Sequence, residues 1–402
     1  MRDLDLICTS LLDQAHLQLK KYFSDPASLQ RLRTELVFHS LSYHIASNQE
    51  FAAYARTLAG SGILSEEILD SADMPLLPSS FFKRQDMSVA STTAQHIVKT
   101  CISSGTSGSI STVGRDEQSL LNFMTSITAS LPAFFELDRT ADYCGIVLGP
   151  STNEAGDLWF SYVISCINLL MQTTYCEQDH TFYAEQAAAV IEKRLQQDEP
   201  FVLIGPPLRI LQVCEILKSR PLKVCSGKSY VISAGGWKSF ENKAIAAPEF
   251  RAIVMAALGI SDESQIRDSF NMVELNTVIS ECEYHRKHIP PWLIVQSRDP
   301  KTNVVLSDGQ LGILAFMDAG AMSYPCFILS EDFGAVDSQA CPCGRGGGTF
   351  HIARRMSKIE QRGCALKMSG GQGRHHAQGS SRFFTSVYRA DSWPTTRLSG
   401  KT

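Results

Sequence analysis

The chain has 402 residues, of which 44% are hydrophobic and 19% are charged, as in ordinary soluble globular proteins. A net charge of −4, without basic runs interleaved with aromatic residues, argues against a nucleic-acid partner. The apolar runs are shorter than the roughly 20 residues that a membrane span needs, and the first residues lack a signal-peptide pattern. We therefore expect a cytoplasmic protein with no membrane span.

The periodicity of apolar residues divides the chain into three regions. Residues 1–72 are predicted to form a helical N-terminal lead-in, because apolar residues recur at spacings of three and four. In residues 73–354 short β-type runs alternate with helical runs, which predicts an α/β domain with a parallel sheet flanked by helices. Residues 355–402 have no sustained period and are expected to form a hinge, a short C-terminal region and a tail.

A serine- and glycine-rich loop, Ser-Ser-Gly-Thr-Ser-Gly-Ser, occupies residues 103–109. It follows a predicted strand that ends at Ile102 and precedes a predicted helix that Asp116 would cap. We expect the strand to belong to the parallel sheet and the loop to lead into the helix, so that its amides face an anion such as phosphate. A flexible turn is the alternative. The loop is not a Walker loop, because no Gly-Lys-Ser/Thr sequence follows it.

Four further motifs follow this loop in a defined order. They are Ser-Ala-Gly-Gly-Trp-Lys at 233–238, Asp-Ser-Phe-Asn-Met-Val-Glu at 268–274, Leu-Ser-Glu-Asp-Phe-Gly at 329–334 and Ala-Arg-Arg-Met-Ser-Lys at 353–358. The order resembles that of the adenylate-forming superfamily. The resemblance implies an α/β adenylate-forming fold, with the large domain in 73–354 and a truncated small C-terminal region.

A narrower resemblance, to the acyl-protein synthetases of the LuxE family, covers about residues 70–368. It rests on five segments, Leu-Pro-Ser-Ser-Phe-Phe-Lys at 77–83, Ser-Ala-Gly-Gly-Trp-Lys at 233–238, the stretch from Glu281 to Pro291, Arg-Asp-Pro at 298–300 and Cys-Pro-Cys-Gly-Arg at 341–345. The phenylacetate–CoA ligases share much of this pattern but keep a full small domain. The superfamily's adenylation lysine lies near the end of that domain, and we expect residues 355–402 to be too short to carry it there.

The resemblance implies that the chain uses ATP and magnesium to activate a fatty or other hydrophobic carboxylic acid as acyl-AMP. The acyl group would then pass to a protein cysteine thiol, and the partner would be an acyl-CoA reductase or a carrier protein. One alternative is a ligase that delivers the acyl group to coenzyme A or to a carrier protein's phosphopantetheine. Another is a catalytically silent homologue that binds an acid or a partner.

The resemblance also implies the positions of the site residues. Glu274 would hold magnesium, Asp332 would accept hydrogen bonds from the ribose hydroxyls, and Arg355 would support the same ribose as a catalytic residue. For Asp332 and Arg355 the alternative is a surface ion pair. The other nucleotide-binding positions would be Ser103, Ser104, Gly105, Thr106, Ser107 and Gly108 at the β- and γ-phosphates, Gly235 and Gly236 at the adenine, and Phe270 and Asn271.

The chain departs from the superfamily's motifs at several positions. Ile110 and Ser111 stand where Pro-Lys often closes the phosphate loop, so Arg115 is expected to meet the pyrophosphate. Val273 replaces a threonine and offers no side-chain hydrogen bond to a phosphate. This second departure favours the silent homologue.

Four residues are spaced as ligands of a structural zinc ion. Cys282 and His288 stand close in sequence, and Cys341 and Cys343 are separated by one residue. Three thiolates and one imidazole suit tetrahedral zinc with every position closed. The alternatives are that no metal binds or that His285 replaces His288.

Cys364 is the candidate acyl acceptor. It is the last cysteine of the chain, and Arg362 and Lys367 on either side favour the thiolate that nucleophilic attack requires. The alternative is a small buried residue on a strand after the hinge.

Overall fold

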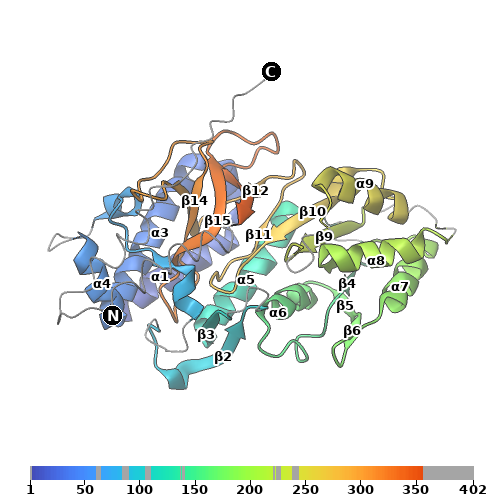
Figure 1. Ribbon diagram of the computed structural model, residues 1–402, viewed down its shortest axis with the longest axis horizontal. Coiled ribbons are helices and arrows are strands. Elements are labelled where there is room, and N and C mark those ends of the chain that lie inside the picture. Colours follow the sequence, from blue (N-terminus) through green and yellow to red (C-terminus); the bar gives the residue numbers. More distant parts are fainter. Residues whose placement is uncertain are drawn as a thin grey trace, which may run out of the picture.

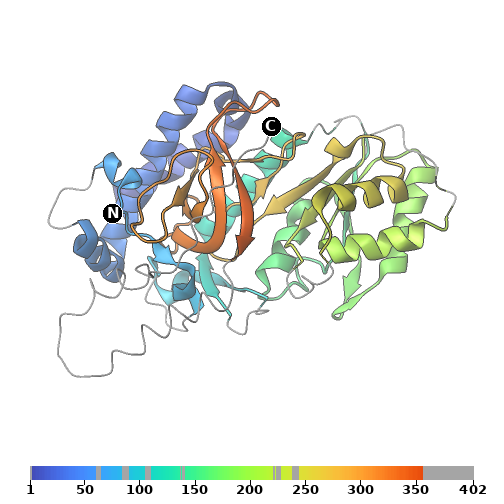
Figure 2. The same cartoon turned by 45° about the horizontal axis from the view of Figure 1, so that its top comes forward.

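Two sheets lie side by side at the centre of the molecule, with helices packed at both ends (Figures 1 and 2). The protein's structure is a computed structural model, and in the part that it describes each of the two sheets has six strands. The described residues are 2–59, 65–83, 90–104, 110–135, 137, 141–220, 222, 228–237 and 244–355.

The N-terminal region is helical, as predicted, and it packs on one of the two sheets rather than standing apart. Asp25 accepts a hydrogen bond from the Ser28 amide (3.2 Å) and so caps the longest of these helices. The ring of Phe51 stacks on that of Phe327 in the sheet, with centroids 5.9 Å apart. The elements are α1 (Arg2–Leu17), α2 (Leu19–Ser24), α3 (Pro26–Ser47), α4 (Gln49–Ala59) and η1 (Glu66–Asp70).

The sheet beside these helices is mainly antiparallel, in the order β12-β16-β15-β14-β13. The predicted alternation of strand and helix does not hold here, because its last strands follow one another without helices between them. Its strands are β12 (Lys287–His288), β13 (Leu293–Arg298), β14 (Gly312–Asp318), β15 (Phe327–Asp337) and β16 (Thr349–Arg355), and the short β1 (Leu77–Pro78), followed by η2 (Ser79–Lys83), pairs parallel to β15.

A bulge interrupts the pairing of β15 with β16. Asp332 pairs with Arg355 and Phe333 with Arg354, but Gly334 pairs with Ile352, so β16 has one extra residue. A Cβ atom on Gly334 would lie 2.1 Å from the His351 carbonyl oxygen, which explains the glycine at this point.

The second sheet confirms the predicted parallel sheet with helices on both faces. All its neighbouring strands are parallel except β11 with β10, in the order β11-β10-β9-β8-β4-β5. Ile146 packs with α7–α9 on one face, and Val147 packs with the core that includes α5 and α6 on the other. The strands are β4 (Cys144–Val147), β5 (Gln172–Tyr175), β8 (Phe201–Gly205), β9 (Tyr230–Ala234), β10 (Ile266–Phe270) and β11 (Ile279–Ser280).

Of the flanking helices, α5, α6, α8 and α9 lie in helical runs of the predicted alternation, whereas α7 was not predicted. In Figure 1, α7, α8 and α9 lie together at the end of the molecule away from the N-terminal helices. These helices are α5 (Glu117–Phe134), α6 (Trp159–Ser165), η4 (Cys166–Leu169), α7 (Ala184–Gln196), α8 (Pro207–Leu217) and α9 (Ala247–Leu258). The remaining short elements are η3 (Ala94–His96), β6 (Glu177–Gln178), β7 (Thr181–Phe182) and η6 (Glu263–Gln265).

The prediction for the strand before the serine-glycine loop was wrong. This strand, β2 (Ile97–Ile102), pairs antiparallel with β3 (Thr112–Asp116) in a two-stranded sheet of its own, so the loop joins two strands of a hairpin. The predicted cap is confirmed, because the Asp116 carboxylate accepts from the Ser119 amide (2.8 Å) at the start of α5. The five residues of β3 separate the loop from the helix, so the loop amides are not those of a helix N-terminus.

A bilayer-spanning helix is not found in the described part of the chain, since none of its helices combines the necessary length with the necessary apolarity.

Candidate active site and metal centre

A cavity of about 400 Å³ gathers most of the residues that the motifs predict. It opens beyond the carboxyl ends of β9 and β10, the edge at which parallel sheets usually bind ligands. The predicted residues in its wall are Ser103, Ser104, Gly235, Gly236, Phe270, Asn271, Glu274, Asp332 and Arg355. Gly105, Thr106, Ser107 and Gly108 lie outside the described residues.

Glu274 is a buried carboxylate in this wall, with 5% of its surface exposed. Burial raises its pKa, because a charged carboxylate loses its hydration, while Ser111, Arg355 and Lys83 oppose the shift. Its backbone carbonyl is fixed by the Tyr324 hydroxyl, which donates across 3.0 Å. A buried carboxylate that has little positive charge around it is a suitable oxygen ligand for a divalent cation such as magnesium.

Asp332 and Arg355 face each other across β15 and β16. The distance from Arg355 Nε to Asp332 Oδ1 is 3.8 Å, and Asp332 is largely buried whereas the Arg355 side chain is 65% exposed. Burial raises the pKa of Asp332, and Arg355 lowers it. The pair lines the cavity, so its carboxylate is directed at a ligand site rather than at open surface.

Gly235 and Gly236 form a flat stretch of wall after β9. Their φ angles are 81° and 60°, a region that favours glycine. A Cβ atom on Gly235 would lie 2.4 Å from Cε2 of Phe160, so no side chain fits there. The Phe160 ring thus covers Gly235, whereas a Cβ atom on Gly236 would have no neighbour within 4 Å, which leaves room for a planar ring such as adenine beside Gly236.

The side chains of Asn271 and Phe270 are held in place by contacts with other residues of the protein. The Trp159 indole donates to Asn271 Oδ1 (2.7 Å), and Asn271 Nδ2 donates to the Thr277 carbonyl (2.7 Å). The ring of Phe270 stacks on Phe316. These contacts fix the shape of the wall, and nucleotide contact by either residue stays a prediction.

The apolar side of the cavity comes from α5, α6, η4, β8 and β9. The helices α5 and α6 contribute both to the hydrophobic core and to the cavity wall, since Ile127 and Ile164 are buried and also line the cavity. The other apolar residues of this side are Leu131, Val163, Ile167, Ile204 and Ile232. A polar end beside an apolar end suits a molecule with a charged head and a hydrocarbon part.

Lys83 and Asp268 also line the cavity, and the motif analysis assigned no role to either. Lys83 ends the quoted segment 77–83, and Asp268 begins the motif 268–274, so position within a motif could have found both. Asp268 accepts from the Ser233 hydroxyl (2.7 Å) and pairs with Lys287 (2.9 Å).

The prediction that Arg115 meets the pyrophosphate was wrong. Its side chain is fully buried, and its guanidinium donates to the carbonyls of Val273 (2.7 Å) and Leu275 (3.0 Å) and to Asn276 Oδ1 (3.0 Å). It also lies over the Trp159 ring, 3.7 Å from the centroid. Arg115 therefore holds the backbone on both sides of Glu274 from behind the cavity wall.

Replacing Arg115 with lysine is expected to lower the free energy of unfolding by about 2–3 kcal/mol, because lysine cannot reproduce the fork of hydrogen bonds. Urea unfolding would measure this, with Arg251→Lys as control, since Arg251 pairs with the exposed Glu263 on the surface. If the Arg115→Lys protein kept its stability yet lost nucleotide binding, the arginine would contact the ligand after all.

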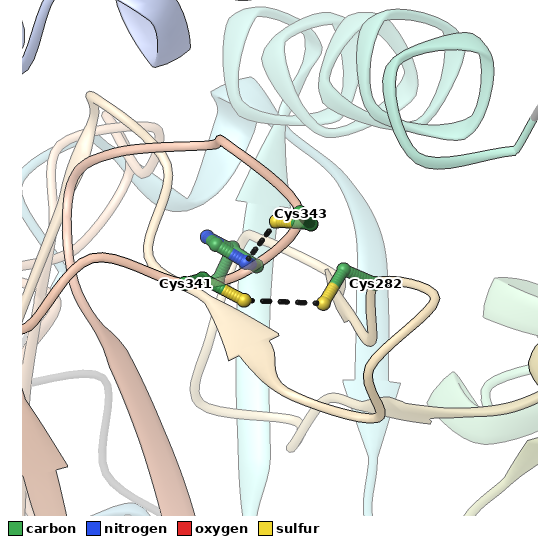
Figure 3. Close-up of side chains that lie close together, drawn as sticks. Cys282, Cys341 and Cys343 are labelled. Atoms are coloured by element: carbon green, nitrogen blue, oxygen red, sulfur yellow. Dashed lines mark hydrogen bonds between the residues drawn. The ribbon is translucent and has the colours of Figure 1, made fainter.

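Cys282, His288, Cys341 and Cys343 form a compact cluster whose ligand atoms all lie within 4.8 Å of one another. Figure 3 shows the three cysteines turned toward a common centre. The sulfurs of Cys282 and Cys341 are 3.7 Å apart, and Cys343 Sγ is 3.2 Å from His288 Nε2. Two sulfurs on tetrahedral zinc are about 3.8 Å apart, given Zn–S bonds of about 2.3 Å.

The surroundings of the cluster suit thiolates bound to a cation. The Tyr284 amide donates to Cys282 Sγ and the Arg345 amide to Cys343 Sγ, each across 3.4 Å. Burial raises the pKa of the Cys282 thiol to about 12, a cost that a bound cation offsets. The alternative ligand His285 lies outside the cluster, where its Nδ1 is 3.7 Å from Glu281 Oε2.

The cluster joins segments that are distant in the chain. Cys282 follows β11, His288 ends β12, and the other two cysteines lie in the connection from β15 to β16. A metal here would link the loop after Glu274 to the loop before Arg355.

Cys364, with Arg362, Lys367 and the C-terminal region and tail after Arg355, lies outside the described residues.

Comparison with known proteins places this geometry in a family. The model of the family described as acyl-protein synthetase, LuxE, matches residues 3–372. A long-chain-fatty-acid–luciferin-component ligase of Aliivibrio fischeri is 31% identical over 344 residues, which are 85% of this chain and 88% of that protein. The ligase of the same name from Vibrio harveyi is 31% identical over 346 residues, with the same coverage.

Solved structures show the fold. An open conformation of a 2-hydroxyisobutyryl-CoA ligase, in complex with 2-HIB-AMP and CoA, superimposes with a TM-score of 0.59 at 15% identity and covers 88% of this chain and 82% of that one. The same ligase in its thioesterification state gives a TM-score of 0.62 at 12% identity, over 84% of this chain and 70% of that one. The predicted adenylate-forming α/β fold is confirmed.

Proposed function

The chain belongs to the acyl-protein synthetase (LuxE) family, and on this premise we propose that it is an ATP-dependent ligase that activates a fatty or other hydrophobic acid. The acid becomes acyl-AMP, and its acyl group then passes to a protein thiol. One observation carries the proposal: a single cavity combines the residues assigned to ATP with an apolar side of suitable character for an acyl chain.

In the adenylation step, a carboxylate oxygen of the acid attacks the α-phosphorus of ATP. A P–O bond forms, the bond from the α-phosphorus to the bridging oxygen breaks, and pyrophosphate leaves with the electron pair. The acid is already ionised near neutral pH, so no general base is required. Magnesium held by Glu274 would offset the negative charge that builds on the phosphates.

The chain's own residues bind and orient ATP in this proposal. Asp332 accepts from the ribose hydroxyls with Arg355 beside it, and Gly235 and Gly236 receive the adenine. The serine-glycine loop holds the terminal phosphates through its backbone amides. Val273 is buried, lines the cavity, and its carbonyl accepts a hydrogen bond from Arg115.

We also propose a zinc ion in the Cys282–His288–Cys341–Cys343 cluster. Four protein ligands close the tetrahedron, so the zinc would be structural. In the same proposal residues 73–354 form the adenylate-forming large domain, residues 1–72 form a helical extension packed on it, and residues 355–402 begin at the hinge.

The proposal is tested by acid-dependent exchange of radiolabelled pyrophosphate into ATP across a panel of carboxylic acids. We expect exchange with long-chain acids and little with acetate, because the apolar side contributes binding only to a hydrocarbon chain. A protein that supports no exchange with any acid would be the silent homologue. Rapid transfer to coenzyme A without self-acylation would favour the acid–CoA ligase instead.

For Cys364→Ser we expect a split phenotype. Adenylation does not need the thiol, so acid-dependent exchange should stay within about twofold of wild type, while thioester-linked acyl label should disappear. Labelling with radioactive acid, followed by hydroxylamine release, measures both. A mutant that still carries a labile label would have another acceptor cysteine, and loss of exchange as well would give Cys364 a structural role.

A further inference from the structure

Lys83 is a cation of the cavity wall that neither the motifs nor the family match assigns to a role. It ends η2, lines the cavity, and its Nζ lies 2.8 Å from Glu331 Oε1. Its side chain is 19% exposed, against 65% for Arg355, the other cation that lines the cavity among the described residues. Lys83 is therefore the better shielded of the two positive charges.

The place of η2 in the fold decides which part of ATP Lys83 can reach. The element contacts β3, which follows the serine-glycine loop, and β15, which carries Asp332. Lys83 also lines the same cavity as Glu274. It thus lies between the residues assigned to the terminal phosphates and the residue assigned to the ribose.

In ATP the α-phosphate is the group that links the ribose to the terminal phosphates. A nucleotide whose ribose contacts Asp332 and whose terminal phosphates contact the loop must carry its α-phosphate past Lys83. The carboxylate of the acid must reach the same phosphorus, so two anions meet beside this ammonium group. Without a nearby cation, their repulsion would oppose the reaction.

We propose that Lys83 is a catalytic residue of adenylation, which contacts the α-phosphate and the attacking carboxylate; this rests on the proposed function. While the new P–O bond forms and pyrophosphate leaves, the ammonium group stays protonated and stabilises charge on the α-phosphate oxygens. It has three N–H donors, so one can remain with Glu331 while two face the substrates.

The test compares Lys83→Met with wild type in two half-reactions. We expect acid-dependent pyrophosphate exchange to fall about 100-fold, the usual effect of losing one charge-stabilising donor. Transfer of the acyl group from chemically prepared acyl-AMP to the protein thiol should fall by less than about tenfold, because no carboxylate has to approach the phosphate in that step and the ammonium group stabilises only the departing AMP. Lys218→Met is the matched control, since Lys218 pairs with Glu215 at 2.6 Å on the surface.

Glu331→Gln shows whether a loss of activity in Lys83→Met comes from the broken ion pair or from the missing ammonium group. It breaks the same ion pair but keeps the lysine. We expect its exchange activity to fall less than about tenfold. An equal loss in Lys83→Met and Glu331→Gln, or loss of both half-reactions in Lys83→Met, would make Lys83 structural and overturn the inference. Full exchange in Lys83→Met would overturn it too, whereas a wild-type protein without any exchange would refute the proposed function itself.

Discussion

Glu274→Gln is expected to lower acid-dependent pyrophosphate exchange by about 1,000-fold, the upper end of what one charge-stabilising group contributes. Glutamine keeps the size of the side chain but removes the charge that would bind magnesium. The exchange assay at saturating ATP and acid measures the effect. Glu215→Gln is a suitable control, because Glu215 is exposed and lies outside the cavity.

The same substitution should leave the apo protein as stable as wild type or more stable. The pKa of Glu274 is raised above its ordinary value of 4.5 by burial, so the folded state binds the proton more tightly than the unfolded state. The carboxylate therefore lowers the free energy of unfolding above that pH, and the cost vanishes as pH falls below it. In urea unfolding at several pH values, the free energy of unfolding of the mutant should exceed that of wild type by an amount that decreases as the pH is lowered.

Activity that stays within a few-fold of wild type in Glu274→Gln would refute the assignment of the magnesium ligand. Lower stability at neutral pH would instead mean that the carboxylate has a structural partner in the folded protein.

Cys341→Ser is expected to remove the metal and to lower the free energy of unfolding by more than about 4 kcal/mol, as the loss of a structural metal does. Wild-type protein purified without chelator should contain one zinc ion per chain by elemental analysis. Thermal or urea unfolding with and without chelator measures the stabilisation. The effect should be large because the cluster joins two loops beside the candidate active site.

Cys214→Ser is the matched control for the zinc prediction. Cys214 is also fully buried, but it lies in α8 away from the cluster, so its replacement should cost stability without changing the zinc content. Wild-type protein that contains no zinc and unfolds equally with and without chelator would contradict the prediction.

Local patterns predicted the parts of the fold that depend on neighbours in sequence. Helices such as α8 follow from apolar spacing. The zinc candidates follow from ligand types near one another, and the predicted His288, not the alternative His285, joins the cluster. The motifs also predicted residues that meet in one cavity, because β9, β10, β15 and β16, which carry or precede four of the motifs, all border that cavity.

The errors concern one local hairpin and two contacts between segments that are distant in the chain. Arg115 looked like a phosphate ligand, but its partners Val273 and Leu275 lie more than 150 positions away, and their carbonyls leave no trace in side-chain patterns. The pairing of β2 with β3 was missed because the strand Thr112–Asp116 is short and adjoins a helix. Lys83 ends the quoted segment 77–83, but the segment alone does not show that η2 lies at the cavity, so the residue was given no role.

The bulge between β15 and β16 determines which of two adjacent arginines stands opposite the ribose-binding candidate. If the regular pairing of Gly334 with Ile352 continued without the extra residue, Asp332 would face Arg354 instead of Arg355. A one-residue insertion in β16 with the bulge kept would likewise place Arg354 there, whereas a one-residue deletion that removed the bulge would leave Arg355 opposite Asp332. The duplicated arginine makes this position of the site tolerant of small insertions and deletions during evolution, where a single arginine would be lost to the opposite face of the sheet.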